Sequence, residues 1–313
     1  GIKGLMVTAV LALLSQVLLQ IIDMRKTPFR YKFIVNFKDK HVKKILYLIF
    51  PIIFSVGIDD LNKIIDKALA STLIAGSISA LNYANRLISL VRDLFILTIA
   101  TVMYPLLSNE ANKDTYDGLK RVTINGINII LLITIPATTG MIILANPIVR
   151  LVFERGKFDA AATYMTAGAF VFSAIGLVGT SLRMQLDNIY YSLQDTRTPV
   201  INGFISVVIN VVLNLILIKP MAHRGLALAT SISATVSSML LIYGLRKKIG
   251  PFGFMNSVKC GLKSLTASMV MGIVVYFLNI TLSQKLGSGT LPQLFSLLIT
   301  AGIGALIYSV LIY

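Results

Sequence analysis

The sequence has little charge, a single cysteine and no tryptophan. Asp, Glu, Lys and Arg make up 13% of its residues, about half the share that a soluble domain usually carries. One cysteine, Cys260, excludes a disulfide within the chain and a metal site built from several cysteines. The two histidines, His41 and His223, stand far apart in expected loops, where each is predicted to be solvated. No glycine-rich phosphate loop is present either, so the sequence offers no catalytic constellation and an enzyme is not expected.

Long apolar runs fill most of the chain. Hydrophobic residues make up 56% of it, and the mean hydropathy is +0.81. The runs are about 20 residues long, the length of a helix that crosses a hydrocarbon core of about 30 Å. We therefore predict an all-α, polytopic membrane protein with about nine transmembrane helices. The predicted spans are residues 4–22, 45–70, 77–107, 122–144, 162–191, 199–218, 225–245, 260–281 and 291–312.

Acidic residues are scarce beside basic ones, with 13 Asp and Glu against 29 Lys and Arg. The basic residues lie between the apolar runs without a nucleic-acid-binding motif, so nucleic acid is not an expected partner. The loops on one side carry most of them, which predicts that this side and the C-terminus at Tyr313 are cytoplasmic. The first basic loop, residues 23–44, also carries aromatic residues. It is expected either to lie amphipathically on anionic lipid or to be a solvated loop.

Charged residues also fall inside the second predicted span, where a charge at mid-bilayer costs at least about 2.5–3.5 kcal/mol on insertion scales. The span carries Asp59, Asp60, Lys63, Asp66 and Lys67. Helical spacing places Asp59, Lys63 and Asp66 on one face, and we expect that face to line a polar cavity. The alternative is that Asp59 and Lys63 neutralise each other within the helix.

The third span carries Asn82, Asn85 and Arg86, and no acidic residue lies within one helical turn of Arg86. A guanidinium that faces a cavity is suited to bidentate binding of phosphate. The alternative is an ion pair between Arg86 and an aspartate of the second span. The two readings are compatible if the protein changes conformation.

Two more pairs of opposite charge occur in the spans. Arg92 stands beside Asp93, but adjacent residues on an α-helix point in different directions. Arg183 and Asp187 in the fifth span are four residues apart, the spacing that favours an intrahelical ion pair. We interpret the second pair as mainly structural.

Side chains with hard oxygen ligands recur in three spans. Asn210 and Asn214 in the sixth are four residues apart and share a face, and Thr230 in the seventh and Asp66 in the second could join them. Such a set could hold Na⁺ or form a proton-coupled cluster. Hydrogen bonding between helices is the alternative use of the asparagines.

Three segments of the chain resemble the MurJ-type lipid II flippases of the multidrug and polysaccharide-lipid exporter superfamily. They are residues 75–87 (AGSISALNYANRL), 152–159 (VFERGKFD) and 190–199 (YYSLQDTRTP). The resemblance covers essentially the whole chain and implies a two-lobed transporter of fourteen helices with a central cavity. On that pattern residues 1–22 are the last helix of the N-lobe and 23–44 a basic cytoplasmic loop. Residues 45–248 then form the six-helix C-lobe, and 249–313 two helices that border a groove for a lipid tail.

The resemblance also implies roles for the polar residues. Arg86 matches the cavity arginine that is thought to engage the substrate's pyrophosphate, and the other substrate-binding candidates are Asn85, Asn82, Asp59 and Lys63. The set Asp66, Asn210, Asn214 and Thr230 falls where a sodium site has been proposed. Many members have Asp where Asn85 stands and an acidic residue where Asn214 stands. The second departure removes one formal negative charge from the ion site.

The implied function is the movement of lipid II from the inner to the outer leaflet of the bacterial cytoplasmic membrane by alternating access. The expected partners are lipid II, membrane lipids and, as candidates, cell-wall synthesis proteins, with Na⁺ or H⁺ as the coupling ion and no other cofactor. Alternatives are an exporter of another polysaccharide-lipid or of drugs, and a non-transporting membrane scaffold for cell-wall enzymes. Since the chain opens with Gly1 and lacks the N-lobe arginines, we expect a fragment that does not transport by itself.

Overall fold

The computed structural model describes residues 2–24, 39–40, 42, 57, 60–286 and 289–313, and every regular element among them is a helix. The chain divides into two units, Gly1–Tyr47 and Leu48–Tyr313. In the first unit, α1 (Ile2–Met24) exposes apolar side chains such as Leu13 and Leu19. A helix that is apolar on every side is suited to lipid or to a protein interior rather than to water.

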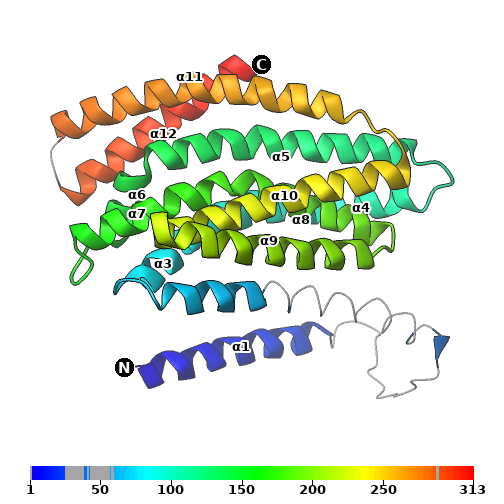
Figure 1. Ribbon diagram of the computed structural model, residues 1–313, viewed down its shortest axis with the longest axis horizontal. Helices are drawn as coiled ribbons and strands as arrows, with labels where there is room; N and C mark the ends of the chain where they lie inside the picture. Colours follow the sequence, from blue (N-terminus) through cyan, green and yellow to red (C-terminus); the bar gives the residue numbers. More distant parts are fainter. Residues whose placement is uncertain (1, 25–38, 41, 43–56, 58–59, 287–288) are drawn as a thin grey trace. The chain divides into compact units, whose positions relative to one another are not determined.

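The second unit is a bundle of helices joined by short connections (Figure 1). Residues 60–70 are helical. They are followed by α3 (Ser77–Val91), the π-helix η1 (Arg92–Leu97), α4 (Thr98–Ala111), α5 (Asp117–Ile143), α6 (Ala145–Phe153), α7 (Ala160–Ile175), α8 (Leu177–Ser192), α9 (Arg197–Met221), α10 (His223–Ile249), α11 (Phe254–Leu286) and α12 (Thr290–Ile312). These elements account for the all-α class that was predicted.

Within the described residues, six helices are long and apolar enough to cross a membrane, and the bent pair α7–α8 would make a seventh. They correspond to seven of the nine predicted spans. The predicted span 4–22 lies within α1, but the apolar part of α1, Met6–Ile22, is shorter than the six long helices. The predicted span 45–70 lies largely outside the described residues. The number nine therefore stays a prediction.

The fifth predicted span is broken into α7 and α8, which meet at an angle of 45° at Gly176. The Gly176 N–H bonds to the carbonyl of Ser173, so the carbonyl of Phe172 loses its usual partner in the helix. Ser231 Oγ of α10 donates to that carbonyl at 2.6 Å. A side chain at Gly176 or Gly179 would come within 2.8 Å of the α10 backbone, so these glycines let α8 approach α10 closely.

Two features differ from the sequence predictions. The helix α6 was not predicted, because it is only nine residues long and follows α5 after one residue; Pro147 fits within its first turn. His223 was predicted to be solvated in a loop, and this is wrong. It is buried at the first position of α10, and its Nε2 lies 3.0 Å from the carbonyl oxygen of Met165.

The last two helices pack beside α5 (Figure 1). Met271 and Val275 of α11 form a buried cluster with Leu144 and Leu297. Tyr308 of α12 donates a hydrogen bond to the carbonyl of Leu132 at 2.8 Å. This pair therefore covers α5.

Candidate functional site

A cavity of about 780 Å³ lies between the helical residues 60–70 and the helices α3, α8 and α10. Its lining is rich in charged and polar side chains, which those elements and η1 supply. They include Asn62, Lys63, Asp66, Lys67, Asn82, Asn85, Ser89, Arg92, Asp93, Thr180, Arg183, Asp187, Asn188, Tyr191 and Thr230. The surrounding helices are otherwise apolar, so the charged side chains within them largely face this cavity.

The second predicted span turns charge toward this cavity, as expected for Lys63 and Asp66. Asp59 lies outside the described residues, so its place in the cavity and its pairing with Lys63 stay predictions. In the structure Lys63 Nζ instead bonds to Asp60 Oδ1 at 2.8 Å, and both side chains are largely exposed. Lys67 also lines the cavity, and it has no ion pair with any residue that the structure describes.

The three candidate residues on α3 do not all line the cavity. Asn82 and Asn85 line the cavity, whereas Arg86 is exposed on the same helix and is not part of the lining. Arg86 makes no ion pair with a described residue, so the predicted alternative, a pair with an aspartate of the second span, is not found at Asp60 or Asp66. The third candidate partner, Asp59, lies outside the described residues. Phosphate binding by Arg86 stays a prediction, and a ligand would reach Arg86 from outside this cavity wall.

The π-helical turn η1 begins with an ion pair that sequence reasoning missed. Arg92 and Asp93 were expected to point in different directions, but both line the cavity and their Nε and Oδ1 atoms lie 3.1 Å apart. In η1 the helix is wound more widely than an α-helix, which changes the directions of successive side chains. Single π-helical turns inside α-helices occur frequently at functional sites. No sequence signal for this turn was recognised.

The ion pair predicted within the fifth span is present, with Arg183 Nε 3.8 Å from Asp187 Oδ2. Both side chains line the cavity, so the pair lies inside the bundle, and its mainly structural role stays a prediction. Together with Arg92 and Asp93, it gives the cavity two arginines that each have a carboxylate beside them.

The four residues of the predicted ion site come together from three helical segments. Asn214 Nδ2 donates to Asp66 Oδ1 at 2.6 Å and to Asn210 Oδ1 at 2.8 Å. Thr230 Oγ1 lies 3.3 Å from Asp66 Oδ2 and 3.1 Å from the Asn210 amide. With the Asn210 amide turned over, its nitrogen would donate to Asp66 Oδ1 at 3.1 Å and to Asn62 Oδ1 at 2.9 Å. The spacing of Asn210 and Asn214 was the only local signal for this cluster.

The cluster has the chemistry that a hard cation needs. A carboxylate, two amide oxygens and a hydroxyl are oxygen ligands of the kind that hard cations prefer. Asn210 and Asn214 are fully buried, and Asn214 Oδ1 has no hydrogen-bond partner among the described residues. An unbonded buried carbonyl oxygen is costly unless something else satisfies it. These residues therefore fit Na⁺, although they also satisfy one another as an interhelical network.

Two of the sequence segments that carry the family resemblance form connections between helices, and hydrogen bonds to an aspartate stabilise each of them. At the α8–α9 turn, Asp195 accepts hydrogen bonds from Lys248 Nζ at 2.6 Å and from the backbone N–H of Thr198 at 3.0 Å. Burial raises the pKa of Asp195, but the bonds from Lys248 and Thr198 outweigh it and hold that pKa below its usual value. At the α6–α7 turn, Asp159 caps α7 by accepting from the Ala162 N–H at 2.8 Å.

Comparison with known proteins identifies relatives over most of the chain. The family model described as "Lipid II flippase MurJ" matches residues 1–296. A probable lipid II flippase MurJ of Haemophilus influenzae is 34% identical over 270 residues, which cover 84% of this chain and 53% of the relative. One of Vibrio cholerae is 38% identical over 210 residues, which cover 67% of this chain and 40% of the relative. The chain thus spans about half the length of these curated relatives.

Solved structures have a similar fold. A lipid II flippase MurJ in an inward closed conformation superposes with a TM-score of 0.71 at 27% identity, over 94% of this chain and 58% of that one. An outward-facing multidrug resistance MATE transporter superposes with a TM-score of 0.59 at 18% identity, over 86% of this chain and 63% of that one. The second likeness concerns the fold alone.

Proposed function

We propose that this chain, which belongs to the lipid II flippase MurJ family, forms one lobe of a transporter that moves lipid II from the inner to the outer leaflet. The observation that carries the proposal is the charged cavity of about 780 Å³ inside a bundle of apolar helices. Charges that face an interior cavity are expensive to keep in a membrane and typically mark a substrate or ion pathway.

The basic side chains of this lobe suit an anionic headgroup. Lys67 lines the cavity without a carboxylate partner among the described residues, and Arg86, which lies on α3 outside the lining, has no ion pair with a described residue either. Guanidinium and ammonium groups form charge-assisted hydrogen bonds with phosphate oxygens, which are about twice as strong as neutral ones. In the proposed mechanism the pyrophosphate of lipid II binds Arg86 together with groups from the other lobe, Lys67 adds positive charge to the cavity, and the lipid tail stays in the bilayer.

The cluster around Asp66 is the proposed site of the coupling ion. Asp66, Asn210, Asn214 and Thr230 would hold Na⁺, whose binding would neutralise the carboxylate inside the membrane. Asn214 Nδ2 now donates to Asp66 Oδ1 at 2.6 Å. Turning either amide would exchange an N–H donor for an oxygen ligand at the same place. Protonation of Asp66 is the alternative that the sequence left open.

The protein is a multi-pass membrane protein, and we place its basic connections in the cytoplasm. The α4–α5 and α10–α11 connections lie at one end of the second unit with the α8–α9 turn, where Lys248 of α10 binds Asp195 (Figure 1). This end carries Lys113, Lys120, Arg197, Arg246 and Lys247, as the positive-inside rule expects for the cytoplasmic side of a bacterial inner-membrane protein. Cell-wall synthesis proteins are candidate partners there.

The test is complementation with a full-length transporter that contains this chain, in bacteria depleted of their own lipid II flippase. Lipid II accessible at the outer leaflet is measured for the wild type and for Arg86→Ala. We expect rescue by the wild type and at least about a tenfold loss for Arg86→Ala, the effect of removing one charged hydrogen bond. Arg121→Ala is the matched control, because Arg121 is an exposed arginine at the cytoplasmic end of α5.

Each outcome has a separate meaning. Rescue by both variants would retain the flippase and reject the phosphate role of Arg86. Rescue by neither, with normal membrane insertion, would favour an exporter of another polysaccharide-lipid or a membrane scaffold for cell-wall enzymes. Export of cationic drugs is the weaker alternative, because a drug exporter would prefer an acidic or aromatic cavity to one with unpaired basic groups.

A further inference from the structure

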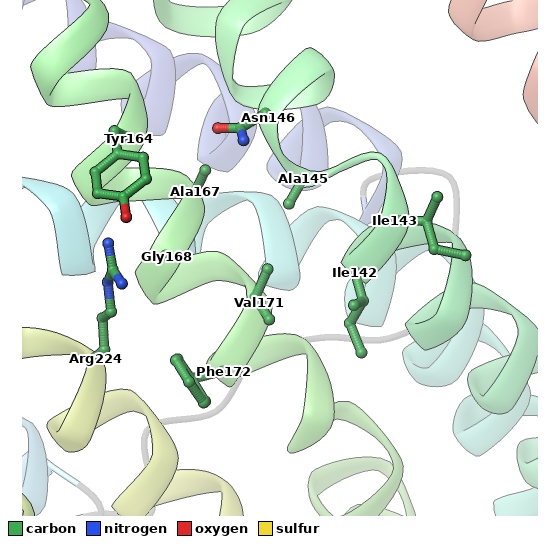
Figure 2. Close-up of a pocket in the computed structure, with 10 residues that line it drawn as sticks. All are labelled: Ile142, Ile143, Ala145, Asn146, Tyr164, Ala167, Gly168, Val171, Phe172 and Arg224. Atoms are coloured by element: carbon green, nitrogen blue, oxygen red, sulfur yellow. The ribbon is translucent and has the colours of Figure 1, made fainter. Parts of the chain in front are cut away.

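A second, smaller cavity of about 250 Å³ lies where α5, α6, α7 and α10 meet, at the end of the bundle opposite the basic connections. Figure 2 shows its two kinds of wall. Ile142, Val171 and Phe172 form an apolar side, and Asn146, Tyr164 and Arg224 bring polar groups to the same space. None of these residues belongs to the cavity of the proposed transport site.

Arg224 lies in this cavity without a counter-ion among the described residues. Its guanidinium carbon lies 4.7 Å from the centroid of the Tyr164 ring, a cation–π contact. On its other side it lies against Gly168 of α7, where any side chain would collide with Arg224 Nε. The Nε atom is buried and has no hydrogen-bond partner among the described residues.

The acidic groups at this end of the bundle are already engaged. Glu154 Oε1 pairs with Arg150 Nε at 3.3 Å, and its Oε2 accepts from Thr163 Oγ1 at 2.8 Å. Asp159 caps the N-terminus of α7. Arg224 forms no ion pair with any residue that the structure describes. A half-buried guanidinium without a carboxylate beside it keeps its donors available for an external anion.

The chemistry of the ligand follows from these two walls. The planar fork of Arg224 matches two oxygens of a phosphate group, and the Asn146 amide lies across the same space as a further polar group. The apolar wall formed by Ile142, Val171 and Phe172 suits a hydrocarbon chain. Tyr164 is exposed near the start of α7, a position typical of the aromatic residues that lie at headgroup level in membranes. A phosphate joined to an acyl chain is a phospholipid.

We propose that this cavity is a binding site for an anionic phospholipid of the leaflet away from the basic connections, with its phosphate on Arg224 and an acyl chain along Ile142, Val171 and Phe172. A net negative headgroup is preferred to a zwitterionic one, because Lys219 adds positive charge at the same end. The site is separate from the transport cavity, so the inference does not depend on the transported substrate.

The experiment measures lipid retention by native mass spectrometry, with the protein taken from detergent micelles containing either phosphatidylglycerol or phosphatidylcholine. The wild type is expected to retain phosphatidylglycerol preferentially. Arg224→Gln should weaken that retention about tenfold, the effect of losing one charged hydrogen bond. Arg224→Lys should recover only part of it, because an ammonium has no planar fork. Arg155→Gln is the matched control, since Arg155 is exposed at the same end and bonds only to its own turn.

A second variant keeps Arg224 but displaces its guanidinium. Gly168→Ala should displace the guanidinium from α7 and reduce phosphatidylglycerol retention although Arg224 is still present. Equal retention by the wild type, Arg224→Gln and Gly168→Ala would overturn the proposal. An equal loss with Arg155→Gln would reduce it to a general charge effect and would also overturn it. Inorganic phosphate is the third probe, and stabilisation by phosphate alone to the same degree would reject the lipid.

Discussion

Among the individual polar residues of the bundle, Asn214 is the most informative. It is fully buried, it donates to Asp66, and its own carbonyl oxygen has no partner among the described residues. Neutral asparagine at this position leaves Asp66 as the only formal charge in the cluster formed by Asp66, Asn210, Asn214 and Thr230. The strength of cation binding at oxygen sites depends on the number of charged ligands.

Asn214→Asp is therefore expected to strengthen sodium binding. In the empty site the added carboxylate repels Asp66, whereas in the occupied site both carboxylates bind Na⁺. The affinity for Na⁺ should therefore rise about tenfold, or by about 1.4 kcal/mol. The measurement is the thermal midpoint in NaCl compared with choline chloride at equal ionic strength. Asn112→Asp, at an exposed helix end, is the control. An unchanged difference between the two salts would mean that the cluster serves only as an interhelical network.

Asp195 predicts a dependence of stability on pH. Its pKa is below the usual value in the folded protein, so its contribution is present above the unfolded pKa of about 3.9 and is lost as pH falls through the folded pKa. Asp195→Asn should lower the free energy of unfolding at neutral pH by about 1–2 kcal/mol, because the charge on the acceptor of the Lys248 bond is lost. The loss stays this small because Lys248 is partly exposed. This difference between wild type and variant should shrink below about pH 4. A difference that is constant down to pH 3 would contradict the role of the carboxylate charge.

At the scale of elements, close packing of α8 on α10 depends on two glycines. Gly176→Ala or Gly179→Ala would place a methyl group within 2.8 Å of the α10 backbone. Overpacking of this kind typically costs about 1–3 kcal/mol. Gly302→Ala in α12 is the matched control, because nothing lies within 4 Å of its added carbon and alanine favours helix. The thermal midpoint should fall for the first two variants and not for the third.

Sequence patterns identified most of these elements but not their irregularities. Apolar run length found six helices that could span a membrane, and a seventh if the bent pair α7–α8 is one span, because these segments are long and mostly apolar. It did not find the break at Gly176, where Ser231 bonds to the Phe172 carbonyl, or the helix α6, which is only nine residues long. Periodicity correctly placed Asn210 and Asn214 on one face, and the family resemblance joined Asp66 and Thr230 to them. Periodicity did not show that Arg86 lies outside the cavity lining, or that Arg92 pairs with Asp93.

At the scale of the whole molecule, the proposed topology predicts which loops are reached from outside the cell. In a Cys260→Ser background, Lys157→Cys on the α6–α7 turn should react with a membrane-impermeant maleimide in intact cells from which the outer membrane has been removed. Lys113→Cys after α4 should react only once the inner membrane is permeabilised. Both lysines are exposed, so accessibility within the protein is matched. The reverse pattern would invert the orientation that the basic residues predict.

One helix connects all the sites described above. Over its 27 residues α10 carries Arg224 in the smaller cavity, Thr230 in the oxygen cluster, Ser231 at the α7–α8 bend and Lys248 on Asp195. An axial slide of this rod by one residue, about 1.5 Å, would change every one of these contacts at once. A pair of spectroscopic distance labels, one on α10 and one on α5, would register such a slide. If α10 slides as a unit, a ligand bound at one end of it is expected to change the contacts at the other end.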